Sequence, residues 1–334
     1  GEVVTANIND GDVTTAKMAT DPTNASNLAS GTVPTARIGA FQTITLDGTA
    51  EGSPAEGDIW YDSGVFYFGT NQVLANAWAS GGDMGTARDY LAGFGTQTAS
   101  VSAGGNLATA RGYFGSCGTN VAGLAMGGWD GSSDAGSTEE YNGTAWSAGG
   151  ALNNTRRELS ATGTQTAAVC QGGYDSVLSE EYDGSSWTNT GSLSTNRYGS
   201  GAAGTQSAGL CFGGKRVTGG SLELTTSEEY NGSTWSAGGS MSTGRHYLWG
   251  AGTQTAGLSY GGNTGSNSAV TEEYNGTTWS AGGDLLTARS GIAGGGTQIS
   301  AVSFGGNTGA RSAATEEYGA GTSTANVLAA SGGL

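Results

Sequence analysis

The sequence predicts an all-β protein built from a repeated unit of four short strands. The first observation is a repeat with a period of 41–48 residues, which occupies most of the chain of 334 residues. The second is a set of fixed spacings, from an Arg to a Gly-Gly pair sixteen residues later and from a Trp to the next Arg ten residues later. The third is an Asn-Gly or Asp-Gly pair in every complete unit, the strongest short signal for a β-hairpin. A skeleton this regular indicates a repeat architecture.

The unit that follows Arg245 contains the four strands in order. A short run leads to Gly-Thr-Gln at 252–254, where Gly can take a positive φ and turn the chain. The second run, 256–260, is apolar and small and ends at its Gly pair. Glu-Glu-Tyr at 272–274 begins the third run, and Trp279 lies on the fourth, after an Asn-Gly turn. We expect an antiparallel sheet in each complete unit.

Four-stranded sheets of this size cannot bury their faces alone, so the units must pack on one another. Radial packing into a β-propeller achieves this and leaves only short sheet edges. Small residues, which crowding near a propeller axis requires, stand eleven positions after each repeat Arg: Ala99, Ala122, Ala167, Ala208, Ala256 and Ser300. Tyr and Trp bring large apolar area and suit the wider outer part of each unit. The expected fold is therefore a β-propeller.

The repeated Arg, Tyr and Trp are predicted to be structural. They are Arg111, Arg156, Arg197, Arg245 and Arg289; Tyr141, Tyr182, Tyr230, Tyr274 and Tyr318; and Trp78, Trp146, Trp187, Trp235 and Trp279. Because every complete unit repeats both an Arg and a Glu-Glu-Tyr motif, we expect each Arg to neutralise a Glu of that motif in its own blade or the next. Such pairs would hold the blades in register and take no part in chemistry.

Two irregular units determine the predicted number of blades. The unit that begins at Arg88 passes from Gly105 almost directly to Arg111, so it lacks its third and fourth strands. The last unit reaches Tyr318 and then has no Trp, for which Trp78 is the natural replacement. An N-terminal strand that completes the C-terminal blade would remove two exposed sheet edges. We predict six blades, one of them truncated, and five full blades plus an added hairpin is the alternative.

The combined motif also resembles a known repeat. A small apolar strand that ends in Gly-Gly, then a Tyr, a Trp a few residues later and an Arg about ten beyond it resemble the Kelch repeat over residues 78–318. The resemblance implies a Kelch-like β-propeller. The chain departs from the Kelch pattern in its doubled Glu before Tyr and in its high content of glycine, 64 residues.

Residues suited to catalysis are few, and we predict that the protein is not an enzyme. Some Kelch-like propellers are copper oxidases that rely on paired histidines and a Cys-linked Tyr, a set that the single histidine, His246, cannot supply. Sialidase-type propellers use an arginine cluster, paired acids and a Tyr, but here every unit repeats its Arg and Glu, which favours a structural role. Cys170 and Cys211 occupy one position of adjacent units and are interpreted as packing residues. We predict no metal site and no cofactor.

The chain is strongly acidic, with a formal net charge of −16. This charge argues against binding to nucleic acid or to an anionic membrane surface, since phosphate contacts need Lys and Arg. No run approaches the ~20 apolar residues of a membrane helix, so we expect no membrane insertion. The chain begins at Gly1 in mid-pattern, and we expect further residues upstream.

Two segments precede the repeats. Residues 1–40 carry isolated apolar residues that cannot form a core within one chain, so this stretch is either a linker or a seam shared between chains. It resembles the shaft and attachment segments of phage tail fibres, which are usually trimeric, and this implies a homotrimer formed through the N-terminal stalk. Residues 41–77 are predicted to be a small β connector with a hairpin across 57–68. The remaining residues, 78–334, are assigned to the propeller.

The segment between each Gly-Gly pair and the next Glu-Glu-Tyr varies in length, whereas the other spacings are fixed. Function on a repeat scaffold concentrates where insertions collect. These segments carry our candidate ligand-binding residues: Trp129, Asp130, Tyr174, Asp175, Lys215, Arg216, Asn263, Asn307 and Arg311. Aromatic, amide and acidic side chains together suit carbohydrate recognition, and the alternative is a set of solvated loops without a ligand.

These observations favour a non-enzymatic virion appendage, a phage fibre protein whose propeller displays loops for recognition of a host-surface glycan or protein. We expect it on the extracellular face of the virion, on tail or capsid, in contact with other virion proteins. A capsid or tail decoration protein with a purely structural propeller is the first alternative. A glycan hydrolase is the second.

Overall fold

The computed structural model describes residues 59–62, 65–68, 77–91, 93–101, 106–217, 222–319 and 326–328. The described part of the chain consists of strands and turns, and none of it forms a helix that could span a membrane. The chain divides into two compact units, one of Gly1–Gln72 with Thr322–Leu334 and one of Val73–Gly321. The predicted fibre-like segment, 1–40, lies outside the described residues.

The described strands of the first unit form one antiparallel sheet of three strands. Its order is β1 (Ile59–Asp62), β2 (Val65–Phe68) and β25 (Asn326–Leu328). The β1–β2 pair confirms the hairpin predicted within the connector. The sheet also recruits β25 from the opposite end of the sequence, because a two-stranded hairpin leaves a free edge that a further strand can pair with.

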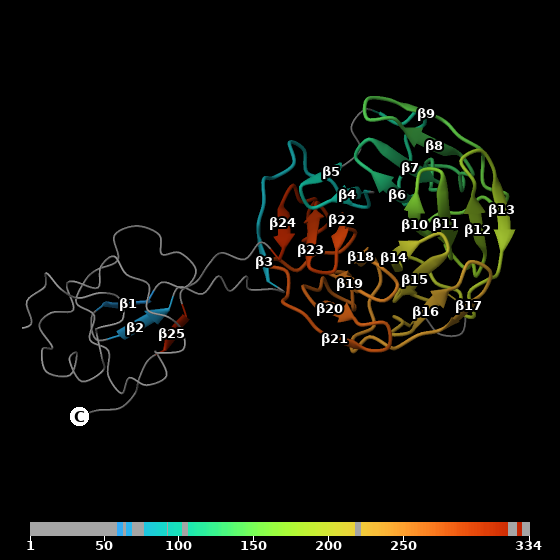
Figure 1. The fold of residues 1–334 in the computed structure, drawn as a ribbon. Helices are drawn as coiled ribbons and strands as arrows, with labels where there is room; N and C mark the ends of the chain where they lie inside the picture. The colour runs from blue at the N-terminus through green and yellow to red at the C-terminus, as the bar shows by residue number, and fades with distance from the viewer. Residues whose placement is uncertain are drawn as a thin grey trace, which may run out of the picture. The chain divides into compact units, whose positions relative to one another are not determined.

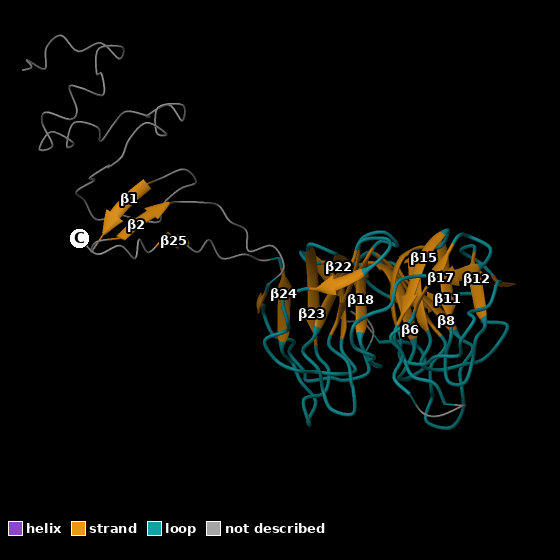
Figure 2. Cartoon of the chain, turned by 90° about the horizontal axis from the view of Figure 1, so that it is seen from below, coloured by secondary structure: helices purple, strands orange, loops and turns teal. Residues whose placement is uncertain are grey.

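The second unit is a β-propeller with five four-stranded blades (Figures 1 and 2). The first three blades are β6 (Gly115–Thr119), β7 (Ala122–Met126), β8 (Thr138–Tyr141) and β9 (Trp146–Ala148); β10 (Ser160–Thr164), β11 (Ala167–Gln171), β12 (Ser179–Tyr182) and β13 (Trp187–Thr190); and β14 (Gly201–Thr205), β15 (Ala208–Phe212), β16 (Ser227–Tyr230) and β17 (Trp235–Ala237). The fourth is β18 (Trp249–Gly252), β19 (Gly257–Tyr260), β20 (Thr271–Tyr274) and β21 (Trp279–Ala281). The fifth is β22 (Ala293–Thr297), β23 (Ser300–Phe304), β24 (Thr315–Tyr318) and β3 (Trp78–Ser80).

The prediction of six blades is wrong. Five blades have four strands, and the two-stranded sheet of β4 (Phe94–Thr96) and β5 (Ala99–Val101) fills the remaining position between β22 and β6. The sequence explains this, because the unit after Arg88 has no Glu-Glu-Tyr strand and no Trp strand before Arg111. The alternative of five full blades plus a hairpin therefore describes the fold.

The ring is closed by an N-terminal strand, as predicted. Strand β3 pairs antiparallel with β24, and Trp78 lies opposite Tyr318. The indole N–H of Trp78 donates a hydrogen bond to Thr271 Oγ1 in the fourth blade, 3.0 Å away. The side-chain amide of Gln97, in the β4–β5 hairpin, donates to the carbonyl of Tyr318 at 3.0 Å. Two elements from the start of the propeller thus hold its last blade.

The predicted arginine–glutamate pairs are confirmed in all five blades. Each Arg pairs with the first Glu of the Glu-Glu-Tyr motif in its own blade: Arg111–Glu139 at 3.1 Å, Arg156–Glu180 and Arg197–Glu228 at 2.7 Å, Arg245–Glu272 at 2.9 Å and Arg289–Glu316 at 2.8 Å. All ten side chains are at most 5% exposed. Arg88, whose unit lacks the motif, is exposed instead.

In four of the five motifs the second Glu binds the neighbouring blade. It accepts the hydroxyl of the next Tyr along the ring, as in Tyr182 to Glu140 at 2.6 Å and Tyr318 to Glu273 at 2.6 Å. Burial raises the pKa of Tyr182 to about 12, and the hydrogen bond to Glu140 adds to the rise, so this hydroxyl stays a donor. The first Glu of the motif thus neutralises the Arg of its own blade, and the second Glu links adjacent blades.

Apolar side chains fill the space between adjacent blades. One cluster joins Leu124 and Met126 of the first blade to Tyr182 and Trp187 of the second. The first strands line the axis, so the small residues on the second strands do not face it as expected. A Cβ added to Gly257 would lie 2.9 Å from a methyl of Leu210 in the preceding blade.

We predict that Trp78→Ala lowers the free energy of unfolding by ~3–5 kcal/mol, because it leaves a cavity at a buried site and removes the hydrogen bond to the fourth blade. Urea titration measures the loss. Trp187, equally buried at 5% exposure, serves as the matched control. Both alanine variants should lose stability, but only Trp78→Ala should speed amide exchange in β24. A loss below ~1 kcal/mol for Trp78→Ala would contradict closure by this strand.

We predict that Arg197→Met destabilises the protein by ~3–5 kcal/mol, because it leaves Glu228 charged and buried without its partner. Arg311 provides the control, since its pair with Asp89 is 3.0 Å long but its side chain is 72% exposed. Arg311→Met should lose less than ~1 kcal/mol. Adding Glu228→Gln to Arg197→Met should restore part of the stability. Equal losses for the two single variants would refute the assigned role of burial.

Candidate functional site

Long loops gather on one face of the propeller (Figure 2). The loop between the second and third strands of a blade and the loop that enters the blade are joined by isolated bridges, such as Gly112↔Trp129, Tyr198↔Lys215 and His246↔Asn263. We call this surface the loop face. The segments that vary in length in the sequence therefore lie beside segments of fixed length.

Five backbone hydrogen bonds link six residues around the axis on the loop face. These residues stand second after each repeat Arg: Tyr90, Tyr113, Glu158, Gly199, Tyr247 and Gly291. All six have φ between 49° and 59°. Each N–H except that of Tyr113 donates to the carbonyl of the preceding member, and the bond from Tyr90 to Gly291, 2.9 Å long, joins the first member to the last. We call these six residues the axial ring.

Four members of the axial ring hold side chains in a strained backbone. A positive φ costs a residue with a Cβ on the order of 1–3 kcal/mol. Gly199 and Gly291 occupy equivalent positions without that cost, so the fold does not require a side chain there. The strained residues are three tyrosines and one glutamate, and strain of this kind concentrates at functional sites.

The tyrosines of the axial ring belong to a larger aromatic patch. Tyr90 lies 4.7 Å from Tyr113 and 5.0 Å from Tyr247 between ring centroids. Tyr198 continues the patch, 5.9 Å from Tyr247 and 5.6 Å from Tyr174. Tyr174 is 44% exposed, and the other four tyrosines are half-buried. Monomeric proteins leave such continuous apolar surface exposed mainly at binding sites.

Arg157 extends the aromatic patch to Trp129. Its guanidinium lies 4.4 Å from the ring centroid of Tyr174 and 4.8 Å from that of Trp129, within cation–π range. One of its nitrogens also forms an ion pair with Asp134 at 2.7 Å. Trp129, Arg157 and Tyr174 thus form a fixed polar edge to the patch.

Glu158 provides an acidic group at the centre of the loop face. Its Oε1 accepts a hydrogen bond from Tyr247 Oη at 3.1 Å, and its Oε2 has no hydrogen-bond partner among the described residues. Burial raises the pKa of Glu158, although the Tyr247 hydrogen bond and the charge of Arg157 act in the opposite direction. Burial also raises the pKa values of Tyr90, Tyr113 and Tyr198, with the Glu158 charge adding to each rise.

The structure brings together only some of the predicted binding residues. Trp129 and Tyr174 meet through Arg157, while Asn307 and Arg311 meet at Asp89, at 3.2 and 3.0 Å. The remaining candidates have local roles. Asp130 caps its own turn at Ser132 and Ser133, Asp175 accepts from Asn196, Lys215 pairs with Glu223, the Arg216 N–H donates to the Leu222 carbonyl, and Asn263 accepts the N–H of Gly265.

Sequence reasoning missed the centre of the candidate site. Tyr90, Tyr113, Arg157, Glu158 and Tyr198 all lie one or two residues after a repeat Arg, in loops whose length never changes. These residues could have been found by comparing the first and second positions after each repeat Arg. Those two positions hold aromatic or charged residues in some units and Gly or Ser in others. Variation in loop length, on which the prediction relied, does not detect them.

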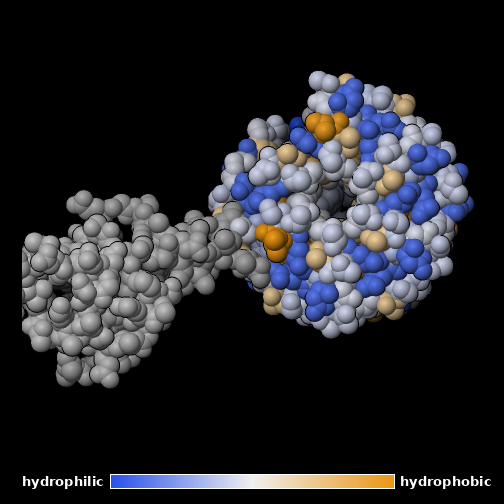
Figure 3. All heavy atoms as spheres, viewed as in Figure 1, coloured by the Kyte–Doolittle hydropathy of each residue, from blue (hydrophilic) through white to orange (hydrophobic). Residues whose placement is uncertain are grey.

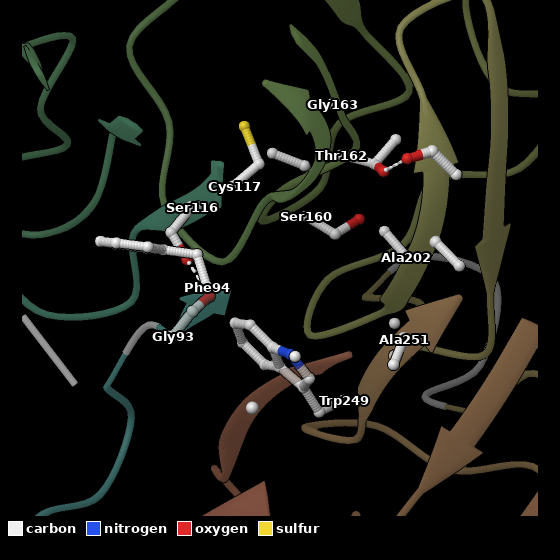
Figure 4. A pocket seen from close by; sticks show the side chains of 18 of the residues that line it. Gly93, Phe94, Ser116, Cys117, Ser160, Thr162, Gly163, Ala202, Trp249 and Ala251 are labelled. Atoms are coloured by element: carbon white, nitrogen blue, oxygen red, sulfur yellow. Dashed lines mark hydrogen bonds between the residues drawn. The ribbon is translucent and has the colours of Figure 1, made fainter. Parts of the chain in front are cut away.

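A cavity of about 150 Å³ runs along the axis, lined by the first strands. Seen along the axis, its mouth is the hollow at the centre of the ring (Figure 3). Trp249 enters this space among small side chains such as Ser116, Ser160 and Ala202 (Figure 4). The equivalent positions in the other units hold Ala, Gly or Ser, so Trp249 is the one aromatic residue at this position of the repeat.

The described residues offer little for metal or arginine-based chemistry. No group of three His, Cys, Asp or Glu side chains lies close enough to hold a metal within the described ranges. The repeat arginines each bind a Glu in a separate blade and do not converge on a pocket. The three Cys are free and buried, and burial raises the pKa of Cys170 to about 11, so its thiol is unreactive at neutral pH.

A scan against models of protein families finds no match to this chain, and a search of curated proteins finds no related sequence.

We predict that Glu158→Gln gains stability relative to the unsubstituted protein as the pH rises from about 4 to 7. The pKa of Glu158 in the folded state lies above its ordinary value of ~4.3, so this carboxyl contributes stability at low pH that is lost as the pH rises through the folded-state pKa. Glutamine does not titrate. Urea unfolding at both pH values measures the difference.

Asp130→Asn is the control of opposite sign. Backbone hydrogen bonds from Ser133 and Ser132 lower the pKa of Asp130 to about 2. Its stabilising contribution is therefore present above the ordinary Asp pKa and lost as the pH falls towards the lowered value. Asp130→Asn should lose relative stability at the higher pH. A pH-independent difference for Glu158→Gln would contradict burial of its carboxyl.

Proposed function

We propose that this protein is a non-enzymatic recognition module that binds a glycan through the aromatic patch on its loop face. The observation that carries the proposal is the continuous patch of Tyr90, Tyr113, Tyr247, Tyr198 and Tyr174, partly held in strained backbone. Aromatic rings offer flat apolar surface with a polar end. Sugar rings have apolar faces and hydroxyl edges, so they match this surface in shape and chemistry.

Polar groups at the edge of the patch support a sugar ligand. Arg157 is fixed between two rings and keeps guanidinium hydrogens near Trp129 and Tyr174. Glu158 and the tyrosine hydroxyls can accept or donate hydrogen bonds at the centre. A small number of placed polar groups among aromatic side chains is the usual composition of a ligand site.

We further propose that the module belongs to a virion appendage. This rests on the resemblance of residues 1–40 to phage tail-fibre segments and of residues 78–318 to Kelch repeats. A trimeric stalk would then anchor the chain among other virion proteins and present three propellers to a host surface. Multivalent display would raise the avidity of weak individual sites.

Two alternatives differ in what the propeller does. A decoration protein would use the loop face for no ligand, and particles lacking it would assemble poorly. A glycan hydrolase would need a reacting acid, for which Glu158 is the best candidate in the described residues because of its place on the axis and its bond to Tyr247. The paired state of the repeat arginines favours recognition over the arginine-cluster chemistry of sialidase-type propellers.

We predict that Tyr174→Ala and Trp129→Ala each weaken glycan binding about tenfold or more, because each removes an aromatic ring that is fixed against Arg157. The full chain is screened on a glycan array, and the best ligand is titrated by calorimetry. Ile299→Ser, at an exposed turn between β22 and β23, is the control and should bind normally. Equal binding by all three variants, or no glycan ligand at all, would overturn the proposal. Glycan turnover abolished by Glu158→Gln would favour the hydrolase.

A further inference from the structure

The carboxylate of Glu158 lacks a charged partner within the described part of the chain. No Lys, Arg or His nitrogen there lies within 4.0 Å of it. Its neighbour Arg157 is engaged with Asp134 at 2.7 Å. The five repeat arginines also have a nitrogen, Nε, without a hydrogen bond, but each of their guanidinium groups is neutralised by a Glu. Glu158 is thus an acid placed among tyrosines with one oxygen, Oε2, unsatisfied.

The surroundings of Glu158 favour a cation. The faces of aromatic rings carry negative electrostatic potential and attract ammonium groups. Tyr90, Tyr113 and Tyr247 line a cavity of about 60 Å³ together with Glu158 and with apolar side chains such as Leu159 and Ile292. A cavity of this size admits a small head group only. Carboxylated or sulfated sugars would be repelled by Glu158 and by the net charge of −16.

The backbone conformation of Glu158 indicates that this side chain has a role other than folding. Its φ is 59°, whereas Gly199 and Gly291 take nearly the same angle, 58°, at equivalent positions of the axial ring. Glycine adopts this conformation without steric cost. Two other units have Gly at this strained position, so the acidic side chain of Glu158 is not needed for folding. We infer that it binds a ligand.

We propose that the axial ring binds a primary ammonium group through Glu158 and the three tyrosines, and that the preferred glycan is therefore an amino sugar. This inference rests on the proposed glycan recognition and adds the chemical class of the ligand. The ammonium donates to Oε2 of Glu158 and lies against the tyrosine rings, while the sugar ring extends over the aromatic patch towards Tyr198 and Tyr174.

The test compares two tetrasaccharides that share one backbone, a β-linked glucosamine tetramer and its N-acetylated form. They differ only in ammonium against acetamide. Calorimetry with the full chain should give a Kd about tenfold lower for the glucosamine tetramer, the size of one hydrogen bond to a charged group. Glu158→Gln should abolish this preference, so that the two tetramers bind with affinities equal within about twofold.

Glu158→Gly separates a binding role from a structural one. It copies Gly199 and Gly291, so it should keep or raise the melting temperature while it also loses the preference for glucosamine. Trp129→Ala should weaken both tetramers equally. Equal affinity for the two tetramers, or a preference that survives Glu158→Gln, would overturn the amino-sugar assignment and leave glycan recognition standing. Absence of binding to these and to every glycan on the array would overturn both.

Discussion

Each complete blade buries an arginine, and this arginine must pair with a glutamate of the same blade. The pair constrains the positions of the strands and loops around it. A buried ion pair stabilises little by itself, but either partner alone is costly, so both must be present and correctly placed. In Arg197 and Glu228 the pair joins the loop that enters the blade to its third strand at 2.7 Å. The same guanidinium donates to the carbonyl of Gly213 at 3.0 Å, which fixes the end of the second strand. One side chain therefore sets the positions of three parts of a blade.

Contacts between blades follow from the same motif. The second Glu accepts a tyrosine hydroxyl from the next blade, and the residue before the first Glu accepts an indole N–H, as Thr138 does from Trp187 at 2.9 Å. The Gln of each Gly-Thr-Gln turn reaches back to the preceding blade, as Gln206 does to Tyr182 at 2.8 Å. Where the β4–β5 hairpin replaces a blade, the following turn has Asn120 in place of Gln. The sequence thus changes at the point where the acceptor strand is missing.

The axial ring links this scaffold to the candidate site. Closure brings six loops to the axis, and a bonded ring with positive φ results. At such positions Gly would be the least strained choice, so each Tyr or Glu there is a departure from local preference. Places where local preference and fold disagree are those where function is expected. The aromatic patch, its acid at the axis and its stacked Arg157 all stand at or beside these departures.

The sequence by itself determined the strands, the pairing of each Arg with a Glu and the closure by Trp78. These features repeat at fixed spacing. A contact that every unit repeats can be predicted from the sequence, because every unit must satisfy the same buried groups. Only the tertiary structure decided the number of blades and the centre of the candidate site. The sequence contains six inner hairpins, but one of them lacks the two outer strands of a blade. Whether the ring closes around that two-stranded hairpin depends on how the neighbouring blades pack, which the sequence of a single unit does not show. Tyr90, Glu158 and Tyr247 stand in three different units, and their loops meet only because the ring closes around one axis.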